Sequence, residues 1–527
     1  MAVTSEIGMN QSDRSLILVL GDRPIDQRPF IQRRLTLKPI KIQQLGDDTL
    51  TKSARGILIT PFEGKFGLVY SYFEECFNHM CELGLMTAVY VTEQKVQVSA
   101  VRDDAYKRHK AGEDIDDLQK RKRWVESLPW VYLGEEDWAI AETLARYDPG
   151  PPLGEPKIDK SSLVEEIGLE SEILLKRAFH DASRITVKRL AGGKTAKEAF
   201  CVFANLANAQ YGPQPMPFFV KLGSACKIDE EKLNYANVAE PFIPFHLRPS
   251  VVSARNVTNL NTAALVCNFV ESAVSLRDSL RAGQGHGCIF SLFEITLHGL
   301  RSHTANGTEK TGVIEAFLDS KVRAREIEEK HPSRIQFLHE YGMTRKPTVI
   351  EHVLRRFAER IKTREGPYHG DLHFGNIMVR NRDAILIDFG SMGPFGPLYA
   401  DPAVLEVSLV FGTDNHDDPD SFHNWRAFVD YLFENPLSPP LSNGDFPQFA
   451  WLHKAVRELR HVVACCGVGE WEAMIILAGC LLRYGRCAPL KLVDGQLDLL
   501  AENRRAYALV VAYKICERLE ELNAKDQ

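Results

Sequence analysis

The segment YHGDLHFGNIMVRNRDAILIDFGSMG, residues 368–393, restricts the possible folds of this chain more than any other stretch. Its apolar runs NIMV (376–379) and AILID (384–388) flank the polar turn RNRD, and this pattern predicts a short β-hairpin. The hairpin would bring Asn376 and Asp388 together at one end. Two side-chain oxygens in this position suit Mg²⁺, which binds few protein ligands and completes its coordination with water and substrate phosphates.

Another polar residue precedes the hairpin. Asp371 lies five residues before Asn376, in the pattern D-x-x-x-x-N, on the loop that leads into the first strand. From this loop its carboxylate could accept a proton from an attacking hydroxyl. Phosphoryl transfer requires metal ions on the phosphates, a base that orients the nucleophile and a cation that holds the nucleotide. The segment therefore predicts this chemistry, with Asp371 and Asn376 as catalytic residues and Asn376 and Asp388 as metal ligands.

The two motifs together resemble the catalytic core of the protein-kinase-like superfamily. HGDLHFGNIMV is similar to the H-G-D-x-H-x-x-N form of aminoglycoside and choline phosphotransferases rather than to the H-R-D of eukaryotic protein kinases, and IDFG resembles the metal-binding D-F-G. LIDFGSMGPFGPLYADPAVLE further resembles the kinase-like members of the ternary complex associated domain families, which accompany bacterial signalling and conflict systems. This narrower resemblance extends over about residues 160–520.

The resemblance implies a bilobed α+β kinase-like fold with a largely helical C-lobe. It also implies ATP and Mg²⁺ as cofactors and a phosphoryl transfer to a hydroxyl acceptor. A catalytically weak nucleotide-binding pseudokinase, a scaffold that couples an N-terminal sensor to partner proteins, is the alternative function. The intact D-x-x-x-x-N and D-F-G motifs favour the enzyme, whereas an irregular glycine loop and an uncertain helix glutamate favour the scaffold.

The sequence identifies the residues that would contact the nucleotide less clearly than it identifies the base and the metal ligands. In the resembled fold a strand lysine contacts the α- and β-phosphates, and PFFVKLG (217–223) offers Lys221 for this role. The lysine pairs there with a glutamate on the following helix, for which Glu231 is the first choice and Glu230 the alternative. A surface lysine on an edge strand and a solvated acid would explain the same residues without a nucleotide.

Two further segments are candidates for nucleotide contacts. The turn RLAGGKTAKEAF contains Gly192 and Gly193, whose backbone N–H groups could bind phosphates. A plain hairpin turn explains these glycines equally well, because the stretch lacks both G-x-G-x-x-G and the P-loop spacing. LVCNFVES would form the hinge between the lobes, where backbone groups of Asn268, Phe269 and the residues up to Glu271 could hold adenine.

Several polar residues outside the hairpin have structural interpretations. His369 and His373 resemble scaffold residues of the catalytic loop, since the loop context argues against a zinc site. Asp401 precedes a proline and is interpreted as the N-cap of a helix. His461 and Cys465 are expected to be buried core residues of a later helix.

A proline- and glycine-rich stretch at 146–160 predicts a linker. Residues 1–145 before it predict an α/β module with a flavodoxin- or receiver-like parallel sheet, because strands alternate with a helical pattern. Residues 161–271 predict the kinase-like N-lobe and 272–527 the helical C-lobe, which carries the catalytic and metal loops. Strands are expected at 15–21, 54–64, 86–93, 185–205 (two strands and a turn), 216–224, 248–257 and 261–270, and helices at 68–84, 162–179, 228–243, 349–362 and 498–522.

The N-terminal module lacks a clear catalytic set. A working receiver needs an acidic pair after its first strand and an aspartate after its third, whereas here Asp22 is a single acid and Thr60 ends the later strand. Glu74 and Glu75 could serve a nucleosidase of the Toll/interleukin-receptor type, but glutamate is a common surface residue of helices. A sensor or docking module for protein partners is the favoured interpretation.

Composition excludes several other classes of protein. Hydrophobic residues make up 44% and charged residues 25% of the 527 residues, as in soluble globular proteins. The net charge of −6 argues against a nucleic-acid partner, and no apolar run is long enough to cross a membrane. The N-terminus lacks a secretory signal, and the cysteines are scattered without a C-x-x-C pair, so a reduced cytoplasmic protein is expected.

Overall fold

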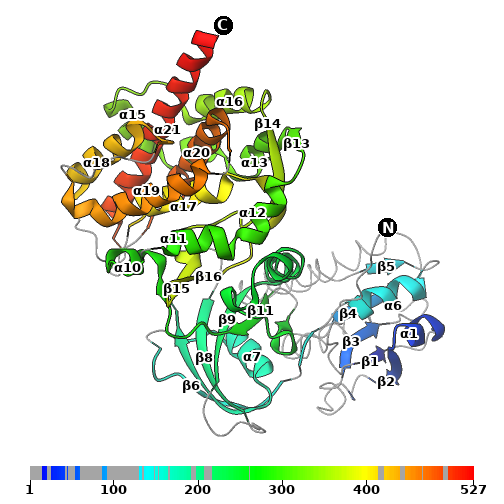
Figure 1. The fold of residues 1–527 in the computed structure, drawn as a ribbon. Coiled ribbons are helices and arrows are strands. Elements are labelled where there is room, and N and C mark those ends of the chain that lie inside the picture. The colour runs from blue at the N-terminus through cyan, green and yellow to red at the C-terminus, as the bar shows by residue number, and fades with distance from the viewer. Residues whose placement is uncertain are drawn as a thin grey trace. The chain divides into compact units, whose positions relative to one another are not determined.

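The computed structural model describes most of the chain after residue 148 and parts of the region before it (Figure 1). The described residues are 15–20, 25–41, 44, 54–59, 86–91, 130–132, 136–146, 149–151, 153–163, 166–190, 198–206, 216–259, 262–285, 287–413, 421–438, 446–465, 467–490 and 496–526. The chain divides into two compact units: unit 1 comprises Met1–Glu230 and Ser250–Val270, and unit 2 comprises Glu231–Pro249 and Glu271–Gln527. The domain limits predicted from the sequence, including the linker at 146–160, remain predictions.

The described part of the first sheet of unit 1 has five strands in the order β2-β1-β3-β4-β5, and every neighbouring pair is parallel. The strands predicted at 15–21, 54–64 and 86–93 are confirmed, and the parallel order alone does not distinguish a receiver from a flavodoxin type. The edge strand β2 was not predicted because a lysine and a proline interrupt its apolar residues. The elements are β1 (Leu16–Leu20), α1 (Arg28–Gln32), β2 (Thr36–Ile40), β3 (Ala54–Ile59), β4 (Met86–Val91), β5 (Trp130–Tyr132) and α6 (Glu136–Arg146).

Part of the reasoning about the N-terminal module falls outside the described residues. This applies to the helix expected at 68–84 and to Asp22, Thr60, Glu74 and Glu75. The described core of this sheet combines apolar side chains of β1 and β3 with those of both helices, among them Ile17, Phe30, Leu58, Ile140 and Leu144.

The second sheet of unit 1 has six strands in the order β10-β11-β9-β8-β7-β6. All neighbours are antiparallel except β6 and β7, which are parallel. The helix expected at 162–179 begins only at Leu169, because Gly168 is the extended residue before its first turn. The elements are β6 (Lys157–Asp159), α7 (Leu169–Ala178), β7 (Ala182–Arg189), β8 (Glu198–Leu206), β9 (Met216–Ser224), α8 (Ala225–Asn234, which continues into unit 2), β10 (Val257–Thr258) and β11 (Thr262–Asn268).

The continuous strand expected at 248–257 is wrong. Val251 makes only a single bridge to β11, and Ser253–Arg255 forms a short 3₁₀ helix. The guanidinium of Arg255 donates to both carboxylate oxygens of Asp181 at 2.7 and 2.8 Å and so stabilises this turn. A pattern of alternating apolar residues cannot reveal such a distant partner.

Unit 2 is mainly helical, with two small three-stranded sheets in the orders β12-β15-β16 and β13-β14-β17. Its described helices are η2 (Tyr235–Ala239), α9 (Glu240–Phe242), η3 (Phe245–Leu247), α10 (Leu276–Arg281), α11 (Cys288–Ser291), η5 (Leu292–Thr296), α12 (His298–Ala305), α13 (Val313–Lys321), α14 (Ala324–Lys330), α15 (Pro332–Glu340), α16 (Pro347–Ala358), η6 (Phe374–Asn376), α17 (Ala400–Phe411), α18 (Phe422–Glu434), η8 (Pro447–Phe449), α19 (Ala450–Ala464), α20 (Glu470–Gly485) and α21 (Leu499–Asp526). Its strands are β12 (Val274–Ser275), β13 (Glu309–Thr311), β14 (Lys362–Tyr368), β15 (Ile377–Arg380), β16 (Asp383–Leu386) and β17 (Gly393–Pro397). Among the described helices, none is long and apolar enough to cross a membrane.

Two helices form the centre of unit 2. Every residue of α17 is buried, and α20 is buried over most of its length. Both helices consist mainly of apolar residues, as expected of helices in the interior of a large domain. α17 and α21 each pack against α20 (Figure 1).

The predicted burial of His461 and Cys465 is wrong, because both side chains are exposed. α19 buries Leu452, Val456 and Leu459, which are spaced along one face of the helix. His461 and Cys465 fall outside this stripe and near the end of the helix, where the neighbouring helices no longer cover it.

Candidate active site

The predicted hairpin is confirmed in unit 2. β15 and β16 are antiparallel, with Ile377 opposite Leu386. The N–H of Ile387 donates to the carbonyl of Asn376 at 3.0 Å and so extends the pairing by one residue. Asn376 and Asp388 therefore flank the same end of the hairpin, as the spacing in the sequence indicated.

The side chain of Asn376 holds the preceding loop. It is 6% exposed, and its Nδ2 donates to the backbone carbonyl of Asp371 at 2.9 Å. Because the amide nitrogen makes this bond, the amide oxygen is the atom that remains for a metal ion. The contact also sets the position of Asp371 relative to the end of the hairpin.

Asp388 adopts a backbone conformation that is uncommon for residues with a side chain. Its φ is 60°, in the left-handed region, and such conformations concentrate at functional sites. The N–H of Gly390 donates to its Oδ1 at 3.3 Å. A Cβ at position 390 would lie 3.4 Å from this oxygen and 3.5 Å from Oε2 of Glu231. The turn that carries Asp388 thus also approaches the carboxylate of Glu231.

Asp371 forms an ion pair that was not predicted. Arg483 of α20 donates through Nη2 to Asp371 Oδ1 at 2.6 Å and through Nη1 to the carbonyl of Gly370 at 3.1 Å. His373 Nε2 lies 3.9 Å from Asp371 Oδ2. Burial alone would raise the pKa of Asp371, but the positive charges around it, of which Arg483 contributes most, together outweigh burial and lower this pKa below its usual value. The carboxylate is therefore ionised at neutral pH, as a general base must be.

The role predicted for Asp401 needs correction. The residue before the first turn of α17 is Tyr399, and no side chain caps the helix. The Asp401 carboxylate instead accepts the N–H groups of His369 at 2.7 Å and Gly370 at 2.9 Å. These bonds hold the catalytic loop from its inner side, and burial raises the pKa of Asp401.

Gly370 is required at the point where the loop turns. Its φ is 76°, and a Cβ there would lie 2.3 Å from the carbonyl oxygen of Ser391. Any other residue would force the loop away from the segment after the hairpin.

The buried side chains behind the loop include Phe389. Its ring lies 5.4 Å from Tyr235 and 6.5 Å from the fully buried His369. His373 accepts the N–H of Gly375 at 3.1 Å through Nδ1 and so caps the short helix η6. These contacts agree with the scaffold roles expected of both histidines.

Lys221 lies in unit 1 on β9, between β8 and β11, and is 5% exposed. The alternative of a surface lysine on an edge strand is therefore wrong. Glu231 is 4% exposed, whereas Glu230 is exposed, which favours Glu231 among the two acids. Because Glu231 belongs to unit 2, the pairing of Lys221 with Glu231 stays a prediction.

The remaining predicted contacts are only partly described. Gly192 and Gly193 lie outside the described residues. The N–H of Asn268 donates to the carbonyl of Ser250 at 3.0 Å, and that of Phe269 donates to Pro217 at 3.4 Å. Both N–H groups are thus used within unit 1, and the contact of these two residues with adenine stays a prediction.

Comparisons with known proteins give one family match and several structural similarities. A search of curated proteins finds no significant match. Among solved structures, the aminoglycoside phosphotransferase APH(4)-Ia is 13% identical over 66% of this chain and 97% of that chain, with a TM-score of 0.39. The phosphotransferase APH(3'')-Id from Streptomyces rimosus is 15% identical over 60% and 99%, with a TM-score of 0.33. A glucosamine kinase is 15% identical over 67% and 86%, with a TM-score of 0.32.

With TM-scores this low, the structural similarities carry no weight for the activity of this chain. The family match covers a continuous part of unit 2, from just before α14 into α21, and includes the hairpin and the catalytic loop. The resemblance to the ternary complex associated domain families is confirmed over residues 323–514, which match the family model of ternary complex associated domain 9.

Proposed function

We propose that the chain is an ATP- and Mg²⁺-dependent phosphotransferase of kinase-like fold, which transfers the γ-phosphoryl group of ATP to a hydroxyl acceptor. One observation carries the proposal. Asp371, Asn376 and Asp388 come from one loop and one hairpin of unit 2, and the Asn376 amide bonds directly to the backbone of Asp371. A base and two oxygen ligands held in this way are the protein's share of phosphoryl-transfer chemistry.

The donors at the end of the hairpin fit Mg²⁺. They are one carboxylate, from Asp388, and one amide oxygen, from Asn376, and Mg²⁺ is commonly bound by one or two protein oxygens together with substrate phosphates. Within the described ranges, no cluster of three or more His, Cys, Asp or Glu side chains offers a complete protein cage for a metal ion. When bound, Mg²⁺ would neutralise charge on the nucleotide phosphates.

Asp371 acts as the base in the proposed reaction. The acceptor O–H bond breaks and its proton moves to the Asp371 carboxylate while the acceptor oxygen bonds to the γ-phosphorus of ATP. The bond between that phosphorus and the bridging oxygen breaks, and ADP leaves with the electron pair. Arg483 helps to keep the Asp371 carboxylate ionised before the reaction, because its charge is the largest of the effects that lower the pKa of Asp371.

The family resemblance supplies the residues that would hold the nucleotide. Lys221 contacts the α- and β-phosphates in this proposal, Glu231 orients Lys221, and the carbonyls of Asn268 and Phe269 receive the adenine. The N-terminal module serves as a sensor or docking module for protein partners, in keeping with the signalling and conflict setting that the same resemblance implies.

The proposal is tested with the full chain and the matched variants Asp388→Asn and Asp383→Asn. Asp383 begins β16, pairs with Arg380 at the opposite end of the same hairpin, and is partly exposed. We expect calorimetry to show Mg²⁺-dependent ATP binding for the wild-type chain and for Asp383→Asn, and a loss of the Mg²⁺ dependence for Asp388→Asn. A wild-type chain that binds no ATP, or an Asp388→Asn variant with unchanged Mg²⁺ dependence, would contradict the proposal.

A further inference from the structure

One cationic side chain bonds to Asp371, and a second, from another helix, lies beside Tyr368, three residues before Asp371. Arg483, from the end of α20, bonds to the Asp371 carboxylate and to the carbonyl of Gly370. Lys321 is the last residue of α13, and its ammonium lies 5.8 Å from the ring centre of Tyr368. Among the described residues it makes no hydrogen bond or ion pair with a carboxylate.

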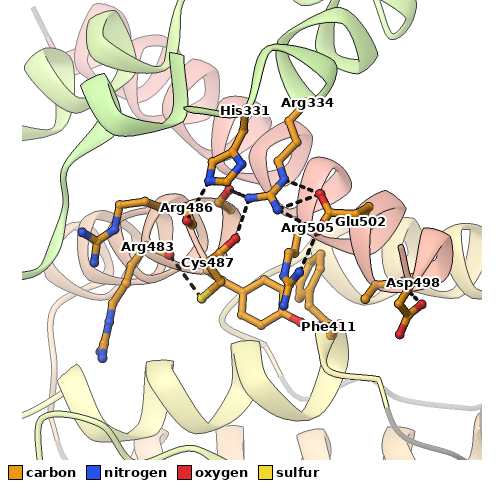
Figure 2. Close-up of polar contacts among 12 residues, drawn as sticks. His331, Arg334, Phe411, Arg483, Arg486, Cys487, Asp498, Glu502 and Arg505 are labelled. Carbon is orange, nitrogen blue, oxygen red and sulfur yellow. Dashed lines mark hydrogen bonds and ion pairs between the residues drawn. The ribbon is translucent and has the colours of Figure 1, made fainter. Parts of the chain in front are cut away.

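The position of Arg483 is held from outside the site (Figure 2). Arg334 of α15 donates to the carbonyls of Gly485 at 2.6 Å and Cys487 at 2.8 Å, at the end of α20. The same guanidinium bonds to both carboxylate oxygens of Glu502 on α21 at 2.7–2.9 Å. The last turn of α20 is thus attached to two neighbouring helices. A cation held in this way is oriented before a ligand arrives.

The two acids near these cations, Asp371 and Asp401, already have hydrogen-bond partners. Asp401 is buried and already accepts two backbone N–H groups of the loop. Asp371 is shared with Arg483 and keeps its second oxygen for the acceptor hydroxyl. The Asp371 and Arg483 side chains are 29% and 20% exposed, so solvent reaches this side of the base. The ammonium of Lys321 forms no ion pair with either acid and lies over the ring of Tyr368, three residues before Asp371.

We propose that Lys321 and Arg483 form an oxyanion subsite, so that the acceptor is a hydroxyl compound that also carries a phosphate ester or a carboxylate. This inference rests on the proposed function, because the hydroxyl that Asp371 deprotonates belongs to the molecule whose anionic group the two cations hold. Arginine and lysine are the side chains that bind phosphate and carboxylate groups most strongly. A cationic acceptor would meet two like charges beside the base and is disfavoured.

Pyridoxal 5′-phosphate is a suitable probe, because its aldehyde forms an imine with a neutral lysine amine and its phosphate needs an anion site. Burial and the charge of Arg483 lower the pKa of Lys321, which increases the neutral fraction of this amine. The full chain is treated with pyridoxal 5′-phosphate or with pyridoxal, which lacks the phosphate. Borohydride then reduces the imine to a stable amine, and peptide mass spectrometry measures labelling at each lysine.

We expect Lys321 to be labelled at least about tenfold faster by pyridoxal 5′-phosphate than by pyridoxal, since charge-assisted hydrogen bonds from the cations favour the phosphate. Arg483→Gln should reduce this ratio toward one, while Arg486→Gln, which alters the same helix end and an exposed pair with Glu326, should preserve it. Because both aldehydes react with the same neutral amine, a change in the pKa of Lys321 alters both labelling rates equally and leaves their ratio unchanged. Lys330, exposed on α14, should show a ratio near one.

Competing anions separate the two chemistries. Protection of Lys321 by inorganic phosphate alone indicates a phosphate ester, and protection by acetate as well indicates a carboxylate. Equal labelling by both aldehydes, or an unlabelled Lys321 beside a labelled Lys330, overturns the subsite. ATP binding is measured on the same samples. If the chain binds no ATP but Lys321 still reacts faster with pyridoxal 5′-phosphate than with pyridoxal, the anion subsite is supported and the proposed phosphotransferase function is contradicted.

Discussion

The buried ion pair between Arg334 and Glu502 gives the sharpest stability prediction. The two side chains are 1% and 13% exposed, and Arg505, also 1% exposed, donates to the same carboxylate at 2.7 Å (Figure 2). Glu502→Gln keeps the size of the side chain but removes its charge. Two buried guanidinium groups then lose the carboxylate that they share.

Removing one partner of a buried pair costs about 3–5 kcal/mol in general. The introduced amide would keep one acceptor oxygen, and Arg334 would keep the two carbonyls at the end of α20, so we expect the lower end, about 3 kcal/mol. For a unit of this size, that loss lowers the thermal midpoint by roughly 5 °C.

The matched control is Glu520→Gln on the same helix. Glu520 pairs with Arg345, and these side chains are 34% and 39% exposed, so the loss should stay below about 1 kcal/mol. Thermal melting monitored by circular dichroism gives the midpoints, and hydrogen exchange on α20 and α21 peptides assigns the transition to unit 2. A Glu502→Gln variant that melts within a degree of Glu520→Gln would refute the reasoning.

The double variant separates charge from packing. In the double variant Arg334→Met with Glu502→Gln, only Arg505 remains as a buried guanidinium without its carboxylate. The decrease in the free energy of unfolding should therefore be smaller than the sum of the decreases in the two single variants. Strict additivity would show that the two residues stabilise unit 2 independently.

Three further predictions concern the site and the chain as a whole. Arg483→Gln should move the acidic limb of the pH–activity profile to higher pH, because the guanidinium charge that favours the ionised form of Asp371 and lowers its pKa is lost; an unmoved limb would exclude Asp371 as the titrating base. Asp401→Asn should leave one buried N–H of the catalytic loop unpaired at a cost of about 1–3 kcal/mol, and faster hydrogen exchange in that loop checks this. A fragment of residues 155–527 should be less stable than one that begins at residue 149, since buried Arg177 donates to the carbonyls of Pro149 and Pro151; equal melting of the two fragments would contradict this.

The hairpin and its polar end were predictable because their determinants are local. NIMV and AILID alternate and flank a polar turn, which is enough to pair β15 with β16 and to bring Asn376 and Asp388 to one end. The strand that carries Lys221 and the helix α16 were predictable for the same reason. Each depends on the spacing of apolar residues within a few turns or strand positions.

The errors lie where side chains have distant partners. The strand expected at 248–257 is interrupted by a turn that Arg255 stabilises through Asp181, 74 residues earlier in the chain. Asp401 has the sequence context of an N-cap, yet its carboxylate bonds to a loop 31 and 32 residues away. The local sequence suggests a strand or a helix cap at these positions, whereas in the folded chain both side chains bond to residues far away in the sequence.

By itself, the sequence determined several strands of both sheets of unit 1 and the β15–β16 hairpin with the residues at its end, because backbone pairing and apolar spacing are properties of short segments. Only the tertiary structure decided which cation meets Asp371, since Arg483 lies 112 residues farther along the chain, on a helix that bears no motif. It also decided that Lys321 stands beside the same loop and that Arg334 holds the end of α20. Such contacts depend on how whole helices pack, and packing is set by the summed burial of many apolar side chains, which no single segment encodes.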